Sequence, residues 1–367
     1  MRFKWIPLPL TLALVGILLA GCSGQTPTSS PPAPGGTQPS SQLQTTGSDL
    51  PPLKHSVTVK IAEDGAPSGA GFYIAEAKGY FRAYGINIQW VTFSNSEDML
   101  PAVAADQVDL AGGISSASLF NAVAQGIDVK AIADKGHDLK NRSYFTLVIR
   151  KQLAGKVKTY SDLKGLTCAI SGRDSVDQYM LDKALGAGGL TEKDVHVVVI
   201  DDFGQMLAAL ANGSVDVAME IEPFIAQGEA QGISVRFLDT TQYLEDAQCA
   251  IVLASPAFVQ KRDVAERFML AYLKGIRDYN AAFVTGNKDR AAITRILMQY
   301  TPLKDPAIWN RAAPTGLDPD GNINIANLQM QYEYYKQGGN VKGNVDLHQV
   351  VDLSLAQQAA KLLGPAS

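Results

Sequence analysis

Two glycines, Gly69 and Gly71, have the clearest chemical potential in this sequence, because they open a predicted helix directly after a predicted strand. In dinucleotide-binding enzymes, a Gly-x-Gly-x-x-Gly turn at this place holds a pyrophosphate, and an acidic residue about 20 positions later binds the ribose. Here Ile74 replaces the third glycine, and Ser94 or Asn95 replaces the acid. The sequence therefore argues against a dinucleotide site. The backbone N–H groups of the helix start still suit an anion or another polar ligand.

The common patterns of catalytic and metal sites are missing. The sequence has no Gly-x-Ser-x-Gly elbow and no P-loop. Residues 318–324 resemble a calcium loop, but their glycine is misplaced, which indicates a turn. Glu220 and Glu222 alternate on a predicted strand and so point to opposite faces. The histidines are scattered and form no pair at ligand spacing (His55, His137, His196 and His348). We expect no catalytic residue, no metal and no cofactor.

An internal repeat defines the elements that position these residues. Residues 99–113 and 206–220 align without a gap, and each segment ends in a Val-Asp-apolar-Ala strand. The strands before them also correspond, as do the strand–helix pairs further upstream. Two copies of a β-α-β-α-β unit therefore lie about 110 residues apart. This alternation of strands and helices predicts an α/β fold with two lobes.

Two extended apolar runs, 143–151 and 247–255, precede and follow the second unit, as strands that cross between the lobes would. The chain after residue 255 is mostly helical and is expected to complete the first lobe. We therefore predict that residues 55–147 plus 253–367 form lobe 1 and that residues 148–252 form lobe 2.

Each strand-to-helix junction carries a polar or glycine-rich cluster. Such junctions gather at the carboxyl ends of the strands, where open α/β sheets bind ligands. Two lobes that present facing rims describe a cleft that closes by hinge motion. The clusters are 67–73, 93–96 and 112–118 in the first lobe and 171–175, 201–204 and 219–224 in the second.

The N-terminus has the features of a lipoprotein signal. Arg2 and Lys4 precede an apolar run of roughly 15 residues, which fits a signal-peptide core. The run ends in Leu-Ala-Gly-Cys, a pattern that resembles a lipobox, so residues 1–21 are expected to be removed and Cys22 to carry lipid. Residues 22–54 are rich in Ser, Thr, Pro and Gly, and this composition predicts a disordered tether. These features place the protein on the extracytoplasmic face of a membrane.

Charge and cysteine content narrow the possible partners. The chain has 32 basic and 36 acidic residues and no basic stripe, so nucleic acid is not expected. Cys168 and Cys249 remain beside Cys22. Outside the cytoplasm they are able to pair, and the alternative is two buried apolar thiols.

Four stretches carry a resemblance to a known family. They are "GFYIAEAKGYFRAYGINIQWV", "VDLAGG" followed by two serines, "SDLKGLTCAISG" and "VDVAMEIEPF". From about Val57 to the C-terminus the chain resembles the substrate-binding proteins of ABC importers for nitrate, alkanesulfonates, taurine and thiamine precursors. The resemblance implies a two-lobed periplasmic-binding-protein-like fold of type II, with two crossover strands and a ligand cleft between the lobes. It also implies a monomer without catalysis that docks on a permease driven by an ATPase.

By position, the resemblance implies ligand contacts from both lobes. In lobe 1 these are Ser68, Gly69, Phe72, Tyr73, Ser94, Asn95, Gly113, Ser115 and Ser116. In lobe 2 they are Ser171, Arg173, Asp174, Glu220 and Glu222. Sulfonate-binding members tend to have Trp-Asp-Pro where this chain has Ile221-Glu222-Pro223, a departure that weakens a sulfonate assignment.

The ligand class stays open between two chemistries. Two carboxylates near a cleft repel an anion, so Glu220 favours a ligand with N–H donors, such as a heteroaromatic ring held by Phe72, Tyr73 or Phe93. The competing ligand is a small anion bound by Arg173 and backbone N–H groups. Two further functions on the same fold are an enzyme of thiamine-pyrimidine synthesis and a sensory lipoprotein. The enzymes of that group carry a cysteine-rich iron-binding motif that this sequence lacks.

Overall fold

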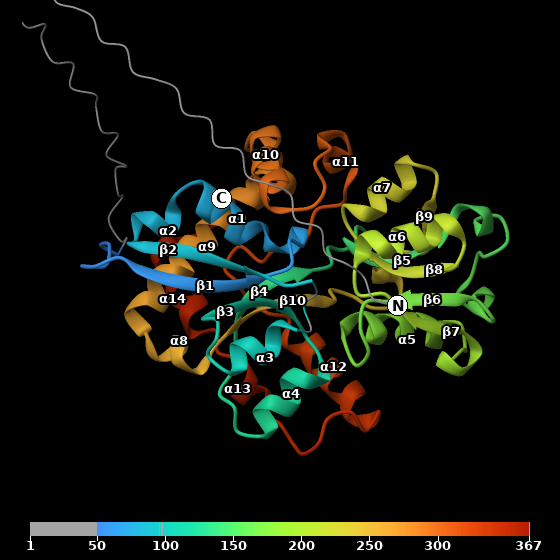
Figure 1. Cartoon of the computed structure of the whole chain (residues 1–367), viewed down its shortest axis with the longest axis horizontal. Helices are drawn as coiled ribbons and strands as arrows, with labels where there is room; N and C mark the ends of the chain where they lie inside the picture. Colours follow the sequence, from blue (N-terminus) through green and yellow to red (C-terminus); the bar gives the residue numbers. More distant parts are fainter. Residues whose placement is uncertain (1–49, 95, 97, 367) are drawn as a thin grey trace, which may run out of the picture. The chain divides into compact units, whose positions relative to one another are not determined.

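The first lobe is built on a five-stranded mixed sheet (Figure 1). Its strand order is β2 (Ile86–Thr92), β1 (Val57–Glu63), β3 (Leu110–Ile114), β10 (Gln248–Ala254) and β4 (Lys130–His137). β1 runs parallel to β2 and β3, and β10 is antiparallel to β3 and β4. The computed structural model describes residues 50–94, 96 and 98–366, so Asn95, Cys22, the signal segment and most of the predicted tether lie outside the described residues.

The second lobe has the same sheet topology. Its strand order is β7 (His196–Val199), β6 (Thr167–Ile170), β8 (Val217–Ile221), β5 (Phe145–Arg150) and β9 (Ser234–Arg236). β6 is parallel to β7 and β8, and β5 is antiparallel to β8. The parallel strands of the two sheets correspond one to one, which confirms the internal repeat and the predicted α/β class.

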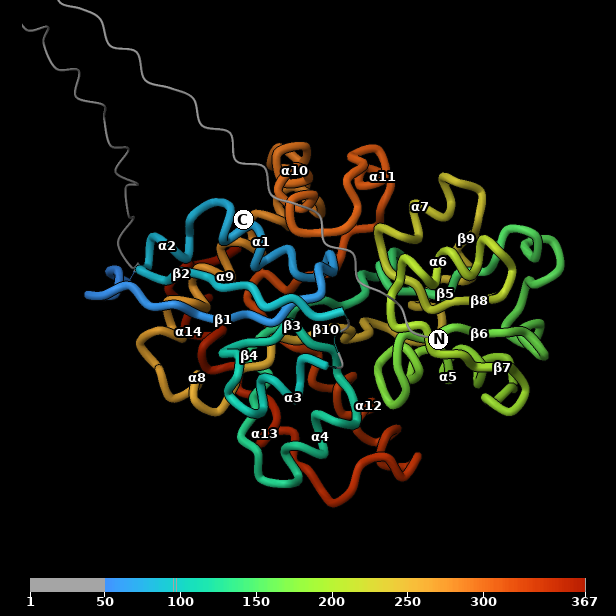
Figure 2. The backbone as a smooth tube through the Cα atoms, viewed as in Figure 1, coloured from blue at the N-terminus to red at the C-terminus, as the bar shows by residue number. Residues whose placement is uncertain are grey.

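The chain passes between the sheets twice, through residues 138–144 and 237–247 (Figure 2). β5 pairs only with strands of the second sheet and β10 only with strands of the first. The predicted lobe boundaries, 147/148 and 252/253, fall inside these two strands. The lobes therefore change over in the irregular segments that precede each strand.

Helices cover both faces of the first sheet. One face packs against α1 (Ala70–Ala77), α2 (Tyr80–Ala83), α9 (Arg262–Phe283) and α14 (Ser354–Leu363), with α10 (Arg290–Tyr300) next to α1 and α9. The other face packs against α3 (Met99–Ala104), α4 (Ala117–Ala124), α12 (Ile325–Gln337) and α13 (Leu347–Val350). α8 (Pro256–Gln260) leads into α9.

The α1–α9 packing depends on glycine. A Cβ on Gly275 would lie 2.1 Å from the carbonyl oxygen of Gly71, and a Cβ on Gly71 would lie 2.5 Å from the ring of Tyr272. Only a residue without a side chain permits this approach, since packed interiors leave no room for an added methyl group. Gly71 therefore serves helix packing rather than the approach of a ligand.

The second sheet is covered by α6 (Phe203–Asn212) and α7 (Phe224–Ala230) on one face and by α5 (Val176–Ala187) on the other. α11 (Pro306–Arg311), from the C-terminal part of the chain, packs against α7. Cys168 in β6 and Cys249 in β10 are both buried free thiols. None of the described helices combines the length and the apolar character that crossing a membrane requires.

The predicted tether ends on the body of the protein before residue 54. Leu50 and Leu53 pack against the core of the first lobe, and the Leu53 N–H donates to the Tyr84 carbonyl at 3.0 Å. The Arg267 guanidinium donates to the Pro51 carbonyl at 2.7 Å. These contacts hold residues 50–53 in place, so the predicted span of 22–54 is too long at its C-terminal end.

Candidate ligand-binding site

A pocket of about 90 Å³ lies where strand ends of the two sheets meet; we call it the main pocket. Lobe 1 contributes the turn after β1, residues 64–67, together with Ser94 and Ser96 after β2 and Ile114 at the end of β3. Lobe 2 contributes Phe145, Ser171, Asp201, Asp202, Phe203, Gly204, Ile221, Pro223 and Phe224. Residues 301–303, after α10, complete it. This is the edge at which parallel strands bind ligands.

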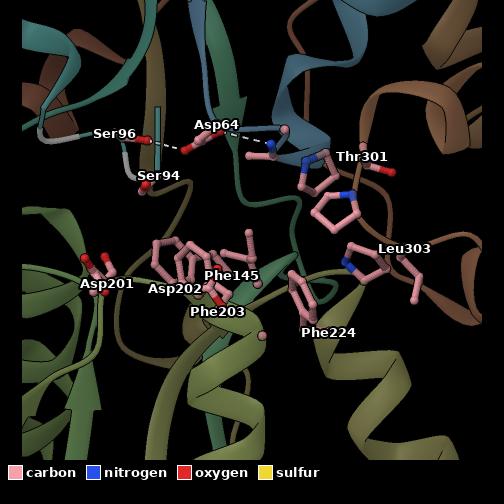
Figure 3. Close-up of a pocket in the computed structure, with 18 of the residues that line it drawn as sticks. Asp64, Ser94, Ser96, Phe145, Asp201, Asp202, Phe203, Phe224, Thr301 and Leu303 are labelled. Carbon is pink, nitrogen blue, oxygen red and sulfur yellow. Dashed lines mark hydrogen bonds between the residues drawn. The ribbon is translucent and has the colours of Figure 1, made fainter. Parts of the chain in front are cut away.

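The lobe 2 side of the main pocket is aromatic (Figure 3). Phe145 begins β5, whereas Phe203 and Phe224 are the first residues of α6 and α7. The Phe145 and Phe203 rings meet edge to face, with centroids 6.0 Å apart and an interplanar angle of 88°. Phe203 and Phe224 are only half-buried, so part of each ring remains available to a ligand.

The polar groups of the main pocket are acidic. Asp64 is held by its neighbours: its Oδ1 accepts from the Ala66 N–H at 2.9 Å and its Oδ2 accepts from the Ser96 hydroxyl at 2.7 Å (Figure 3). Asp202 caps α6 by accepting from the Gln205 N–H at 2.7 Å, and Asp201 next to it is exposed. Among the described lining residues there is no Lys, Arg or His. The pocket therefore offers hydrogen-bond acceptors and no cation.

Two of the predicted site residues line the main pocket, Ser94 and Ser171. Asn95, between Ser94 and Ser96, lies outside the described residues. The remaining predicted residues divide into three groups that the structure places elsewhere. Within the described part of the chain, no group of three or more His, Cys, Asp or Glu residues is arranged to hold a metal ion.

The first group belongs to the core of lobe 1. Ser68 is buried and accepts from the Lys135 ammonium at 3.1 Å, and Gly69 lies directly under the ring of Tyr73. Phe72 is fully buried, with its ring centroid 4.6 Å from that of Tyr272. Tyr73 donates to Glu63 at 2.8 Å. The first turn of α1 faces α9 and the sheet, so these side chains point away from the main pocket.

The second group lies where the lobes touch. Ser116 forms a bridge with Ser175 of lobe 2, and the adjacent Ala117 N–H donates to the Asp174 carbonyl at 2.8 Å. Gly113 pairs with Ile251 inside the sheet, and Ser115 is buried. Arg173 forms an ion pair with Glu192 at 2.9 Å. This group makes lobe–lobe contacts instead of lining the main pocket.

The third group is the glutamate pair of β8. Glu220 is fully buried and its Oε1 accepts from the Ile221 N–H at 3.0 Å. Burial, with Glu222 and Asp202 nearby, raises the pKa of Glu220 well above its ordinary value. Glu222 is also buried, forms an ion pair with Arg236 and accepts from the Ala313 N–H at 2.9 Å. Both glutamates are structural groups that lie beside the main pocket without lining it.

The comparisons with known proteins agree with this architecture. Residues 66–282 match the family model described as "NMT1/THI5 like". The chain is 30% identical over 275 residues to the riboflavin-binding protein RibY of Chloroflexus aurantiacus, which covers 73% of each protein.

Two solved structures have the same fold. The nitrate-binding protein NrtA of Synechocystis superposes with a TM-score of 0.68 at 15% identity and covers 84% of this chain and 89% of its own. The alkanesulfonate-binding protein SsuA of Xanthomonas axonopodis, bound to MOPS, superposes with a TM-score of 0.66 at 19% identity and covers 82% and 99%. The chain therefore belongs to the NMT1/THI5-like family, as its resemblance indicated, and has the two-lobed type II fold of periplasmic binding proteins.

Proposed function

We propose that this protein is the solute-binding component of an ABC importer and that it captures a flavin in the main pocket. It is anchored by lipid on Cys22 at the extracytoplasmic face of the membrane and delivers its ligand, as a monomer, to a permease driven by an ATPase. The observation that carries the proposal is the pocket between the lobes, with three phenylalanines on one side, acidic acceptors around them and no cation among its described lining residues.

The aromatic side of the main pocket suits a flat ring system. Phe203 and Phe224 present ring faces and edges against which a heteroaromatic ring stacks, an arrangement that adds to simple apolar burial. The carboxylates of Asp64, Asp201 and Asp202 accept hydrogen bonds, so they suit a ligand that carries N–H or O–H donors. Riboflavin combines a neutral tricyclic ring, an N–H donor and a chain of hydroxyl groups.

The sequence relative supports the flavin class. RibY is by name a riboflavin-binding protein, and its similarity extends over 73% of this chain. The match to the structural neighbours, by contrast, is at most 19% identical in the two cases above, which supports a shared fold without a shared ligand.

A small anion such as nitrate or a sulfonate is the competing ligand. Anion binding in a partly buried pocket depends on cationic groups or converging N–H donors. Arg173, the cation considered for this role, is paired with Glu192, and its side chain is 45% exposed. Since Asp64, Asp201 and Asp202 would repel an anion, the charges of the pocket favour a neutral ligand.

The size of the main pocket requires the lobes to move. Its volume of about 90 Å³ is below the roughly 300–1,000 Å³ of typical small-molecule sites. A tricyclic ring enters when the lobes separate at the two crossing segments, 138–144 and 237–247. Capture followed by closure is the motion expected of a two-lobed binding protein.

Thermal unfolding of the purified full-length protein in detergent tests the proposal. Riboflavin, nitrate, an alkanesulfonate and a thiamine pyrimidine are added separately, because a ligand that binds only the folded state stabilises it by about 2.7 kcal/mol at 100 times its Kd. We expect riboflavin to raise Tm and its own fluorescence to be quenched. A rise in Tm with nitrate or a sulfonate and none with riboflavin would contradict the flavin assignment.

A further inference from the structure

A second pocket adjoins the main pocket in lobe 1. It has a volume of about 440 Å³ and is lined on its far side by Trp90, Thr92, Gln299 and Tyr300; we call it the side pocket. Asp64, Gly65, Thr301 and Pro302 line both pockets and form their common rim. A ligand seated in the main pocket therefore has a neighbouring space into which a substituent can extend.

The aromatic wall of the side pocket is braced. The rings of Tyr73 and Tyr300 stack with centroids 4.9 Å apart and an interplanar angle of 3°. Trp90 meets Tyr300 edge to face at 5.7 Å. Trp90 and Tyr300 are half-buried, so this rigid wall presents apolar surface to the pocket. Such a surface suits the C–H groups of an alkyl or sugar-like chain.

The polar groups around this wall suit hydroxyl groups. Thr92 and Thr301 carry hydroxyls, Gln299 carries an amide, and Glu63 and Asp64 carry carboxylates. Together they offer both donors and acceptors, which is what a chain of hydroxyl groups requires because each hydroxyl both donates and accepts.

Glu63 is the most constrained of these polar groups. Its side chain is 5% exposed, its Oε2 accepts from the Tyr73 hydroxyl, and its Oε1 lies 3.1 Å from the Lys135 ammonium in an ion pair. Lys135 itself is 1% exposed and does not line the side pocket. A phosphate in the side pocket would therefore meet Glu63 and Asp64 with no cation among the described lining residues to balance it.

From these contacts we propose that the side pocket holds an uncharged polyhydroxyl substituent of the ligand and excludes its phosphorylated form. The inference rests on the proposed function, since it assigns the ribityl chain of riboflavin to the side pocket and its ring to the main pocket. It predicts that the protein selects riboflavin over both lumiflavin, which lacks the chain, and FMN, which ends in a phosphate.

Binding of these three flavins by the full-length protein tests the assignment, with flavin fluorescence as the readout. We expect riboflavin to bind about fivefold or more tightly than lumiflavin, since each net hydrogen bond is worth about that factor. FMN is expected to bind more weakly than riboflavin. Gln299→Ala should weaken riboflavin binding and leave lumiflavin binding unchanged, because Gln299 is exposed at the pocket edge and its truncation does not disturb the core.

A charge added at the same position tests the exclusion of phosphate. Gln299→Arg should reduce the preference for riboflavin over FMN, whereas Gln125→Arg, at an exposed position that lines neither pocket, should leave that preference unchanged. Equal binding of riboflavin and lumiflavin, with Gln299→Ala silent, would overturn the side-pocket assignment alone. Failure of all three flavins to bind would overturn the proposed function as well.

Discussion

At the scale of single residues, Phe203 makes the strongest test of the main pocket. Its ring is half-buried at the pocket wall and rests edge to face on Phe145. Phe203→Leu removes the aromatic face and keeps much of the apolar volume, so riboflavin binding should weaken about threefold to tenfold, in line with an aromatic contact of about 0.5–1.5 kcal/mol. Isothermal titration calorimetry measures this loss.

Phe93→Leu is the matched control for that substitution. Phe93 follows β2 as Phe203 follows β7, and it is also half-buried, but it does not line the main pocket. We expect the control to bind riboflavin as the wild-type protein does. Equal losses in both variants would indicate a general effect on folding in place of a contact with the ligand.

Glu220 yields a prediction about stability. In the folded protein, burial raises the pKa of Glu220 and keeps the group neutral, whereas the unfolded chain ionises it near the ordinary value of 4.5. Its contribution to stability is thus present below the unfolded pKa and is lost as pH rises towards the folded pKa. Glu220→Gln is neutral in both states, so the variant should gain stability relative to the wild type as pH increases.

Urea unfolding at pH 5 and pH 8 measures that difference. Over the range in which only the unfolded chain is ionised, the gain amounts to about 1.4 kcal/mol for each pH unit. Other carboxyl groups titrate equally in both proteins and cancel in the comparison. A variant that differs from the wild type by the same amount at both pH values would show that Glu220 is ionised in the folded state.

The residues also show what sequence reasoning can and cannot locate. The junctions after β2, β6 and β7 were placed correctly near the pocket, because strand pairing brings their carboxyl ends together. The direction of individual side chains was not, since it depends on distant partners: Phe72 faces Tyr272, which is 200 residues away in sequence.

At the scale of elements, the internal repeat predicted the two matching sheets because each copy carries its own strand and helix periodicity. Pocket residues that the repeat does not contain were missed. Phe145 lies on a strand that was assigned to a crossover, and residues 301–303 follow α10 in the helical C-terminal region. No local pattern marks either segment as part of the pocket, because only tertiary packing brings them to it.

Helices α12 and α5 form a contact between the lobes that should control ligand exchange. The Tyr334 hydroxyl on α12 donates to Asp182 Oδ2 on α5 at 2.7 Å. Because the hydrogen bond joins the lobes, it stabilises the closed state only. Tyr334→Phe should therefore speed riboflavin dissociation about fivefold, the factor expected from one net hydrogen bond. Stopped-flow fluorescence measures the rate.

Tyr332→Phe separates closure from folding on the same helix. The Tyr332 hydroxyl accepts from the Val345 N–H at 3.0 Å within lobe 1. Its loss should lower Tm and leave the dissociation rate of riboflavin near that of the wild type. If Tyr334→Phe lowers Tm without changing this rate, the α12–α5 contact has no part in closure.

At the scale of the whole molecule, folding and anchoring are assigned to different parts of the chain. The two sheets, their helices and both pockets lie within residues 50–366, whereas the lipobox cysteine lies at position 22. Ligand binding should then be independent of the lipid, and the lipid should determine only where the protein resides.

Cys22→Ser tests this division of roles. A single acyl chain binds membranes marginally and stable anchoring takes two signals, so a cysteine that carries several chains holds its protein on the membrane until detergent is added. The variant lacks the thiol that accepts the lipid and should move from the membrane fraction to the soluble fraction of the envelope. Its affinity for riboflavin, measured by fluorescence quenching, should equal that of the anchored protein. A variant that stays in the membrane fraction would assign the anchoring to another segment, and one that lost riboflavin binding would show that the pockets depend on the lipid.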